Sequence, residues 1–293
     1  MKLKEKIQEI YEQKYKVLLF FSLALVALAL LQIGIQYATT GDFVHKGISL
    51  KGGSTITITD TSSSIQELQQ FLQSRFPQAE MEVRTIGSAG DPIAIAIDSD
   101  AQQNEEIEAL LAALQEKVDT REVSVEIVGS SLGESFFRQT AKALLVAFIL
   151  MGIVVFINFR IPVPSLAVIA AAFSDIVVTL AIFNLTGEKL TSAGVAAFLM
   201  LVGYSVDTDL LLTNRVLRRE GLVMDKIYSS IKTGLTMTLT TLAAVLVALL
   251  LVNNEVVKQI MLILFIGLIA DMFMTWIQNV AIIRLYLERK GKK

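Results

Sequence analysis

Four aspartates stand inside long apolar stretches of the sequence, where carboxylates are rare. They are Asp175 in AAFSDIVVTL, Asp207 and Asp209 in GYSVDTDLL, and Asp271 in GLIADMFMTW. An aspartate at the centre of a membrane helix costs about 2.5–3.5 kcal/mol on insertion scales. Such groups therefore face a bundle interior or water, and they often serve ion pathways. The chemistry that these residues could perform is the uptake and release of protons.

A purely structural role for the aspartates is the alternative, because buried carboxyl groups can hold helices together through hydrogen bonds. Hydroxyl partners are available in three of the apolar stretches. These candidates are Ser174, Ser205, Thr208, Thr233, Thr236, Thr238, Thr240 and Thr241.

Asp207 and Asp209 are two residues apart, so about 200° separates them on a helix and they cannot share one face. We expect Asp207 to face the bundle interior. Asp209 is expected nearer the cytoplasmic interface, within reach of Arg215 and Arg218.

Small residues stand one turn before two of the aspartates: Gly203 before Asp207 and Gly267 before Asp271. Small residues let membrane helices approach closely, so both glycines are expected at helix contacts. The nearest basic candidate is Lys232, which we place near the inner interface.

Six stretches are long and apolar enough to cross a bilayer core of about 30 Å, which needs roughly 20 helical residues. The composition agrees, because 53% of the 293 residues are hydrophobic and only 18% are charged. The first stretch is longer than the apolar part of a signal peptide, so we predict a retained helix. The stretches run near 17–36, 142–158, 164–184, 192–212, 233–252 and 259–282.

Lysine and arginine predict the orientation, because short cytoplasmic loops are enriched in them. With the N-terminus in the cytoplasm, the basic segments before residue 17, in 215–232 and in 284–293 all lie inside. The short outer loops then carry one lysine each, Lys189 and Lys258. Both termini are therefore expected in the cytoplasm, and the hydrophilic insert 39–135 outside.

The insert is expected to be a separate α+β domain. Alternating strand patterns occur in SLKGGSTITIT, MEVRTIG, PIAIAID and VSVEIVG, with a turn at 87–92. Two amphipathic helices lie between them, with apolar faces at Ile65, Leu68, Leu72 and Phe76 and at Ile107, Leu111, Leu114 and Val118. Ser64 and Glu67 are spaced as a capping box. The order β-α-β-β-α-β is typical of a ferredoxin-like split βαβ unit.

The expected fold class is thus a polytopic α-helical membrane protein, with six transmembrane helices and one external ferredoxin-like domain between helices 1 and 2. Between the fourth and fifth spans we expect a basic surface helix at the cytoplasmic face. The expected parts are a cytoplasmic N-terminal segment 1–16, helix 1 at 17–38, the external domain 39–135, helices 2–6 at 136–285 with a cytoplasmic linker 213–232, and a basic tail 286–293.

Several function classes are disfavoured by what the sequence contains. It has no cysteine and a single histidine, His45, so thiol catalysis and histidine-based metal sites are not expected. Phosphate-loop and H-E-x-x-H patterns do not occur, which argues against an enzyme and against a cofactor. The formal net charge of -2 argues against nucleic acid as a partner.

Motifs in chain order give a resemblance to a known family. The chain resembles the SecF family, the smaller membrane subunits of the SecD–SecF protein-export complexes in the resistance-nodulation-division superfamily. The similar segments are GISLKGGSTI (47–56), VGSSLGESFFRQTAKALL (128–145), SDIVVTLAIFNL (174–185), GYSVDTDLLLTNRV (203–216) and TMTLTTLAA (236–244).

Some positions differ from the family pattern and look like the archaeal form. The family's Asn-Asp pair in the fourth span matches Asp207-Thr208 here, with Asp209 following. An arginine that the bacterial pattern has in the fifth span matches Thr233. Asp175 carries over directly, Asp207 and Asp209 by proximity, and Asp271 rests on its own sequence setting.

The resemblance implies a plasma-membrane subunit that pairs with SecD and assists the Sec translocon channel in exporting preproteins. It implies proton motive force as the energy source. The candidate coupling residues are the four aspartates, of which Asp271 is named from its sequence setting and not from the resemblance. Two alternatives stay open. One is a proton-coupled exporter of small molecules or lipids from the same superfamily, and the other is a passive structural stabiliser of the Sec channel.

Overall fold

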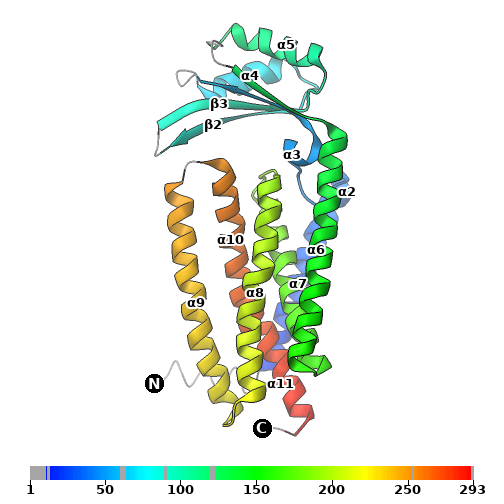
Figure 1. The fold of residues 1–293 in the computed structure, drawn as a ribbon, viewed down its shortest axis with the longest axis vertical. Helices are drawn as coiled ribbons and strands as arrows, with labels where there is room; N and C mark the ends of the chain where they lie inside the picture. Colours follow the sequence, from blue (N-terminus) through cyan, green and yellow to red (C-terminus); the bar gives the residue numbers. More distant parts are fainter. Residues whose placement is uncertain are drawn as a thin grey trace.

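A computed structural model describes residues 11, 14–59, 64–88, 91–118, 123–252 and 254–291. Long helices form an elongated bundle, and a small α+β domain caps one end of it (Figure 1). The predicted N-terminal segment 1–16 lies mostly outside the described residues, as do residues 292–293 of the predicted tail.

Six helices are long and apolar enough to cross a membrane, which confirms the predicted number of spans. Proline at the start of the third fixes a backbone angle already suited to a helix, so this span begins immediately after the preceding turn. The spans are α2 (Tyr15–Thr40), α6 (Ser130–Phe159), α7 (Pro162–Leu185), α8 (Ser192–Arg218), α9 (Val223–Leu251) and a last helix made of α10 (Glu255–Phe273), the π-helix η1 (Met274–Asn279) and α11 (Val280–Arg289).

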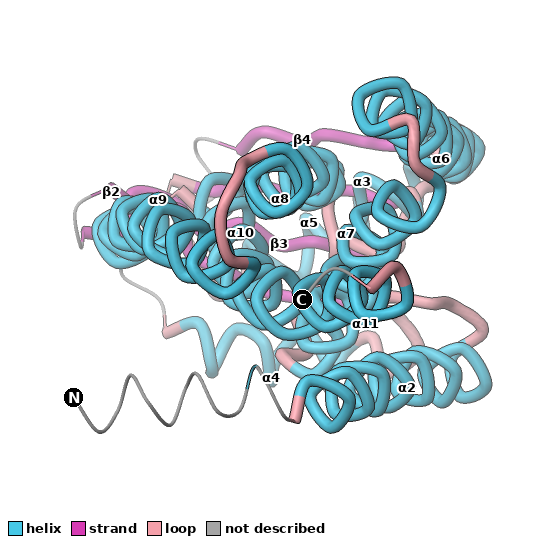
Figure 2. The backbone as a smooth tube through the Cα atoms, turned by 90° about the horizontal axis from the view of Figure 1, so that it is seen from below, coloured by secondary structure: helices cyan, strands magenta, loops and turns pink. Residues whose placement is uncertain are grey.

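The spans differ in how much of their surface the chain itself covers. The most apolar parts of α7 and of the last helix are largely buried, whereas those of α2, α6 and α9 are mostly exposed. Seen from below, α7 and α11 lie near the middle of the bundle, and α2, α6 and α9 lie around them (Figure 2). Apolar side chains therefore face outward along the outer helices, as lipid contact requires.

The predicted surface helix in 213–232 is wrong. Residues up to Arg218 continue α8, and Val223 already begins α9, so only a short connection separates the two spans. The predicted turn at 87–92 lies partly outside the described residues, because β2 ends at Ser88 and β3 begins at Asp91.

The domain between α2 and α6 has the predicted ferredoxin-like order. Its sheet has the order β2-β3-β1-β4, and all neighbouring strands are antiparallel. Ile56 in the central strand stands opposite Ile97 on one side and Val125 on the other. The elements are β1 (Gly53–Ile58), α4 (Ile65–Arg75), β2 (Met81–Ser88), β3 (Asp91–Ser99), α5 (Asn104–Gln115) and β4 (Val123–Val128), with a short α3 (Ile48–Lys51) before them.

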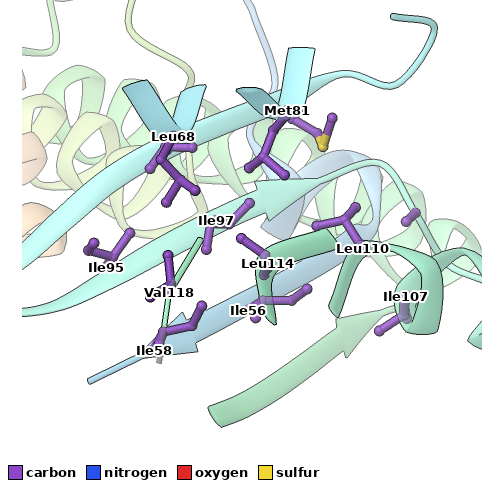
Figure 3. Close-up of a cluster of buried hydrophobic side chains, with 13 residues drawn as sticks. Ile56, Ile58, Leu68, Met81, Ile95, Ile97, Ile107, Leu110, Leu114 and Val118 are labelled. Atoms are coloured by element: carbon purple, nitrogen blue, oxygen red, sulfur yellow. The ribbon is translucent and has the colours of Figure 1, made fainter. Parts of the chain in front are cut away.

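Both domain helices pack on one face of the sheet and enclose an apolar core (Figure 3). The predicted apolar faces are confirmed, with Leu72 and Leu114 fully buried. The predicted capping box of α4 is wrong, because Ser64 occupies the N-cap position without a side-chain hydrogen bond. The capping box belongs instead to α5, where Gln103 and Glu106 form it.

The domain is joined to the bundle through the loop between α7 and α8. Backbone hydrogen bonds run from Gly47 N–H to the Leu190 carbonyl (2.8 Å) and from Leu190 N–H to the His45 carbonyl (2.7 Å). Beside them, Lys189 forms ion pairs with Glu80 (3.4 Å) and Glu82 (3.1 Å) of the domain. We call this set of contacts the joint.

The last helix holds the same loop from the membrane side. The Gln259 side-chain oxygen on α10 accepts hydrogen bonds from the Thr191 N–H (3.0 Å) and hydroxyl (2.6 Å). Its side-chain nitrogen donates to the Lys189 carbonyl (2.8 Å). The joint is therefore fixed to α10 as well as to α7 and α8.

The ionic part of the joint has a defined pH range. A hydrogen bond from Lys51 holds the pKa of the Glu80 carboxyl below its ordinary 4.5. The charged Glu80 therefore stabilises the joint above pH 4.5, and this stabilisation is lost as pH falls through the lowered pKa. Burial alone would lower the pKa of Lys189, but hydrogen bonding and charge from Glu82 outweigh it and raise the pKa above 10.5. The charged Lys189 therefore stabilises the joint below pH 10.5, and this stabilisation is lost as pH rises through the raised pKa.

Lys189→Gln is therefore expected to loosen the joint near neutral pH. Partly exposed ion pairs contribute roughly 0.2–1 kcal/mol, so exchange of the Gly47 and Leu190 amides should accelerate by up to about fivefold. Hydrogen-exchange mass spectrometry on the full chain in detergent measures this. Lys142→Gln, at an exposed position of α6, is the control. Equal exchange in both variants would contradict an ionic contribution to the joint.

Candidate functional site

Three of the four predicted aspartates meet inside the bundle. Asp175 comes from α7, Asp209 from α8 and Asp271 from α10, and each residue is at most 1% exposed. Side chains of α8 bond both Asp175 and Asp271. α10 packs against both α7 and α8, so one region of the interior receives all three side chains. We call these three residues the acidic cluster.

Hydroxyl groups of α8 join the cluster to its neighbours. The Ser205 hydroxyl donates a hydrogen bond to Asp175 across the α7–α8 contact. The Thr208 hydroxyl lies 3.0 Å and 3.2 Å from the two carboxyl oxygens of Asp271, across the α8–α10 contact. Thr275, one turn after Asp271, donates to the same carboxyl at 3.0 Å. One face of α8 thus contacts carboxyl groups on both neighbouring helices.

Two amide side chains complete the surroundings, and both belong to the π-helix η1. Asn279 donates from its side-chain nitrogen to Asp209 at 2.6 Å. Gln278 donates to the Ser174 hydroxyl at 3.0 Å, next to Asp175 in the chain. π-helical segments inside α-helices are frequent at functional sites. They alter the direction of side chains along the helix. Here the π-helix carries both donors beside the cluster.

The hydrogen bonding of the cluster is incomplete. One oxygen of Asp175 and one oxygen of Asp209 are buried without a partner. The side-chain oxygens of Gln278 and Asn279 are likewise buried without one. Buried polar atoms are normally satisfied, so the carboxyl oxygens can take a proton or bond a buried water molecule, and the amide oxygens can accept a hydrogen bond.

Within the described part of the chain, no lysine or arginine forms an ion pair with the cluster. Hydroxyl and amide dipoles alone solvate the three carboxyl groups. A fixed cation would hold a carboxylate permanently charged, whereas hydroxyl groups can either donate to it or accept from its protonated form. The cluster can therefore change its proton content without breaking an ion pair.

The predicted orientation of the pair on α8 is reversed. Asp209 is fully buried, and Asp207 is exposed on the opposite side of the helix. The predicted approach of Arg215 and Arg218 to Asp209 is also wrong. Arg215 bonds Ser229 and Thr233 of α9, and Arg218 bonds Asn158 at the end of α6.

The hydroxyl side chains predicted from the sequence to bond the aspartates behave differently on α8 and on α9. Ser205 and Thr208 contact cluster carboxyl groups, as predicted. The threonines of α9 do not: Thr236, Thr240 and Thr241 donate to backbone carbonyls within their own helix.

The two glycines predicted to lie at helix contacts have different surroundings. A Cβ on Gly267 would lie 2.5 Å from the Leu201 side chain, so this glycine does allow α8 and α10 to approach closely. A Cβ on Gly203 would meet nothing within 4 Å. The close helix contact predicted at Gly203 is therefore absent from the described chain.

Sequence reasoning missed Thr275, Gln278 and Asn279. The sequence did contain a signal for Gln278 and Asn279, because two adjacent amides in an apolar segment are costly to bury unless they are hydrogen-bonded. Among the described residues, no group of three or more histidine, cysteine, aspartate or glutamate side chains could hold a metal ion.

Six apolar spans, a split βαβ domain between the first two and carboxyl groups buried among the helices define a polytopic helical membrane protein. Residues 106–289 match the family model described as protein export membrane protein SecD/SecF, C-terminal. The chain belongs to the SecF family of protein-export membrane proteins.

Curated relatives match along nearly the whole chain. The protein-export membrane protein SecF of Pyrococcus furiosus is 36% identical over 293 residues, which cover 99% of this chain and 98% of the relative. SecF of Methanocaldococcus jannaschii is 37% identical, covering 95% of this chain and 98% of the relative. These descriptions name membrane proteins of export and no catalysed reaction.

A solved structure has a similar fold. SecDF from Thermus thermophilus, described as a translocon-associated membrane protein, matches with a TM-score of 0.75 at 21% identity. The match covers 94% of this chain but only 38% of the SecDF chain, so this chain spans well under half of that protein. At this identity the likeness supports the fold alone.

Thr208→Val should destabilise the site, because it removes a hydroxyl from Asp271 while keeping the side-chain shape. Leaving a buried polar group with fewer partners costs about 1–3 kcal/mol. Thermal unfolding of the full chain in detergent measures the loss. Thr240→Val is the matched control, since that hydroxyl is exposed and donates only within α9. Equal shifts in both variants would show that the Thr208–Asp271 contact contributes nothing.

Proposed function

We propose that this chain is an auxiliary membrane subunit of the Sec translocation machinery, acting with SecD to promote polypeptide export at the expense of the proton gradient. The relatives named as protein-export membrane proteins support the export role. The observation that carries the energetic part is the acidic cluster, buried among three spans and free of ion pairs among the described residues.

Protonation is the chemistry that the cluster can perform. When Asp271 is charged, the hydroxyls of Thr208 and Thr275 donate to it; when it is protonated, it can donate to Thr208 instead. The contact between α8 and α10 then changes with proton content. A proton that moves through 100 mV releases about 2.3 kcal/mol, which is enough to bias two helix arrangements.

The joint offers a route from the cluster to the α+β domain. Asp271 and Gln259 belong to the same helix, and Gln259 holds the loop that carries Lys189. Lys189 in turn contacts the domain through Glu80 and Glu82. A shift of α10 would therefore be passed to the domain, which we propose as the part that touches the emerging polypeptide.

The proposed orientation places both termini in the cytoplasm and residues 39–135 outside the cell membrane, following the distribution of lysine and arginine. The proposed partners are SecD, the Sec translocon channel, exported preproteins and the lipid bilayer. The proposal involves neither nucleic acid nor a cofactor.

Asp175→Asn and Asp209→Asn are expected to lower export by tenfold or more, because amides keep the shape of the cluster but cannot change charge. Secretion of a reporter preprotein is measured in intact cells, with and without a protonophore. The wild type should lose export when the gradient collapses, and the two variants should be insensitive to that treatment. Asp225→Asn, at the exposed start of α9, is the control and should behave as the wild type.

Export at the wild-type level in both cluster variants would contradict proton coupling and would favour a passive stabiliser of the channel. Normal secretion of preproteins combined with lost efflux of a small molecule would favour the exporter instead.

The orientation is testable because the chain contains no cysteine. Glu105→Cys in α5 should react with a membrane-impermeant maleimide in intact cells. Glu220→Cys, in the exposed connection between α8 and α9, should react only after the membrane is permeabilised. The opposite pattern would invert the proposed topology.

A further inference from the structure

The backbone register of the π-helix η1 decides which of its side chains reach the acidic cluster. A π-turn contains one residue more than an α-helical turn. Asn279 follows Asp271 by eight residues. In an uninterrupted α-helix the two side chains would therefore point about 80° apart around the axis, and the additional residue of the π-turn lowers this angle to about 20°. The π-turn thus brings Asn279 to the side of Asp271, where it bonds Asp209.

The sequence of η1 does not by itself require a π-turn. MTWIQN contains neither proline nor glycine, the residues that disfavour an α-helix most strongly. π-helices are rare, so the α-helical register is the ordinary one for such a segment. We therefore looked for contacts from outside the segment that hold the turn.

The first such contact comes from Tyr11, which precedes α2 in the chain. In an α-helix the Val280 N–H would bond the Trp276 carbonyl. Here it bonds the carbonyls of Thr275 and Ile277 instead. The Tyr11 hydroxyl donates to the Trp276 carbonyl at 2.9 Å. Burial raises the pKa of this hydroxyl to about 12, so it remains a donor throughout the neutral range. Tyr11 thus supplies a donor where the π-turn removes one.

The second contact holds the Trp276 side chain against α9. A Cβ on Gly234 would lie 2.2 Å from the indole ring, so the ring packs directly on the backbone of α9. Trp276 is 4% exposed, and its indole N–H has no hydrogen-bond partner among the described residues. Packing therefore holds the ring, and a larger residue at position 234 would displace it.

We propose that Tyr11 and Gly234 are positioning residues for the acidic cluster: they hold the π-turn through Trp276, and the π-turn holds the Asn279 amide against Asp209. The inference rests on the proton-coupled function proposed above and adds two residues to its machinery. Their contacts are with Trp276, so both act on the cluster through η1. Since α2 packs against η1 and α11 (Figure 2), Tyr11 reaches the π-turn from the start of the first span.

Loss of either contact would allow η1 to return to the α-helical register. Asn279 would then turn by about 100° relative to Asp271. The Asp209 carboxyl, one oxygen of which already lacks a partner, would lose its amide donor. The number of donors that the cluster offers to a charged carboxyl group therefore depends on contacts made at some distance from it.

Infrared spectroscopy of the purified full chain in detergent tests the position of the donor without an export assay. The carboxyl stretching band of Asp209 is assigned from the difference between the wild type and Asp209→Asn. Asn279→Leu removes the donor and defines the displacement of this band. Tyr11→Phe and Gly234→Ala are expected to displace the band in the same direction and at least half as far.

Matched controls make the same chemical changes away from η1. Tyr37→Phe removes an exposed hydroxyl from α2, and Gly34→Ala adds a Cβ where nothing lies within 4 Å. Both should leave the band in place. Adding Trp276→Phe to the Gly234→Ala chain should restore the band, because the smaller ring removes the steric conflict. Thermal unfolding of every variant confirms that the chain still folds.

A band at the wild-type position in Tyr11→Phe or in Gly234→Ala would overturn the inference. A displacement that the controls reproduce, or that Trp276→Phe fails to reverse, would overturn it as well. Proton coupling fails by a different result: wild-type export with the cluster variants would contradict it and would leave the infrared result unchanged. The two proposals can therefore fail independently.

Discussion

The structure depends on burying three carboxyl groups in an apolar bundle, where the described residues solvate them with hydroxyl and amide dipoles. Ser205, Thr208 and Thr275 supply hydroxyls, and Asn279 supplies an amide. Each donor must be held in place, because a buried carboxyl oxygen that loses its partner is costly. This requirement accounts for the polar inner face of α8 and for a π-helix directly after Asp271. Around this centre, α2, α6 and α9 shield the polar interior from lipid.

α8 carries a carboxylate on each of two opposite sides, one buried and one exposed. Its inner face contacts the carboxyl groups of Asp175 on α7 and Asp271 on α10, whereas Asp207 is exposed on the other side.

Periodicity and length predicted the spans and the α+β domain because each has a dominant apolar pattern of fixed period. The pattern could also show that Asp207 and Asp209 lie on opposite faces, since that follows from 100° per residue alone. It could not show which faces inward, because the packing of α7 and α10 decides it. The α4 cap failed similarly, since Ser64 has the right spacing without the hydrogen bond. Gln278 and Asn279 were missed because a single π-turn leaves no periodic signal.

The last helix is continuous from Glu255 to Arg289, a rod of roughly 50 Å. Gln259, near the end of this helix that faces the α+β domain, holds the loop beneath the domain, and Asp271 lies about 18 Å further along. No flexible linker interrupts these two positions, so axial travel of one necessarily displaces the other. In the proposed coupling, an axial shift of this helix would carry a change at the carboxyl groups to the Gln259 side chain.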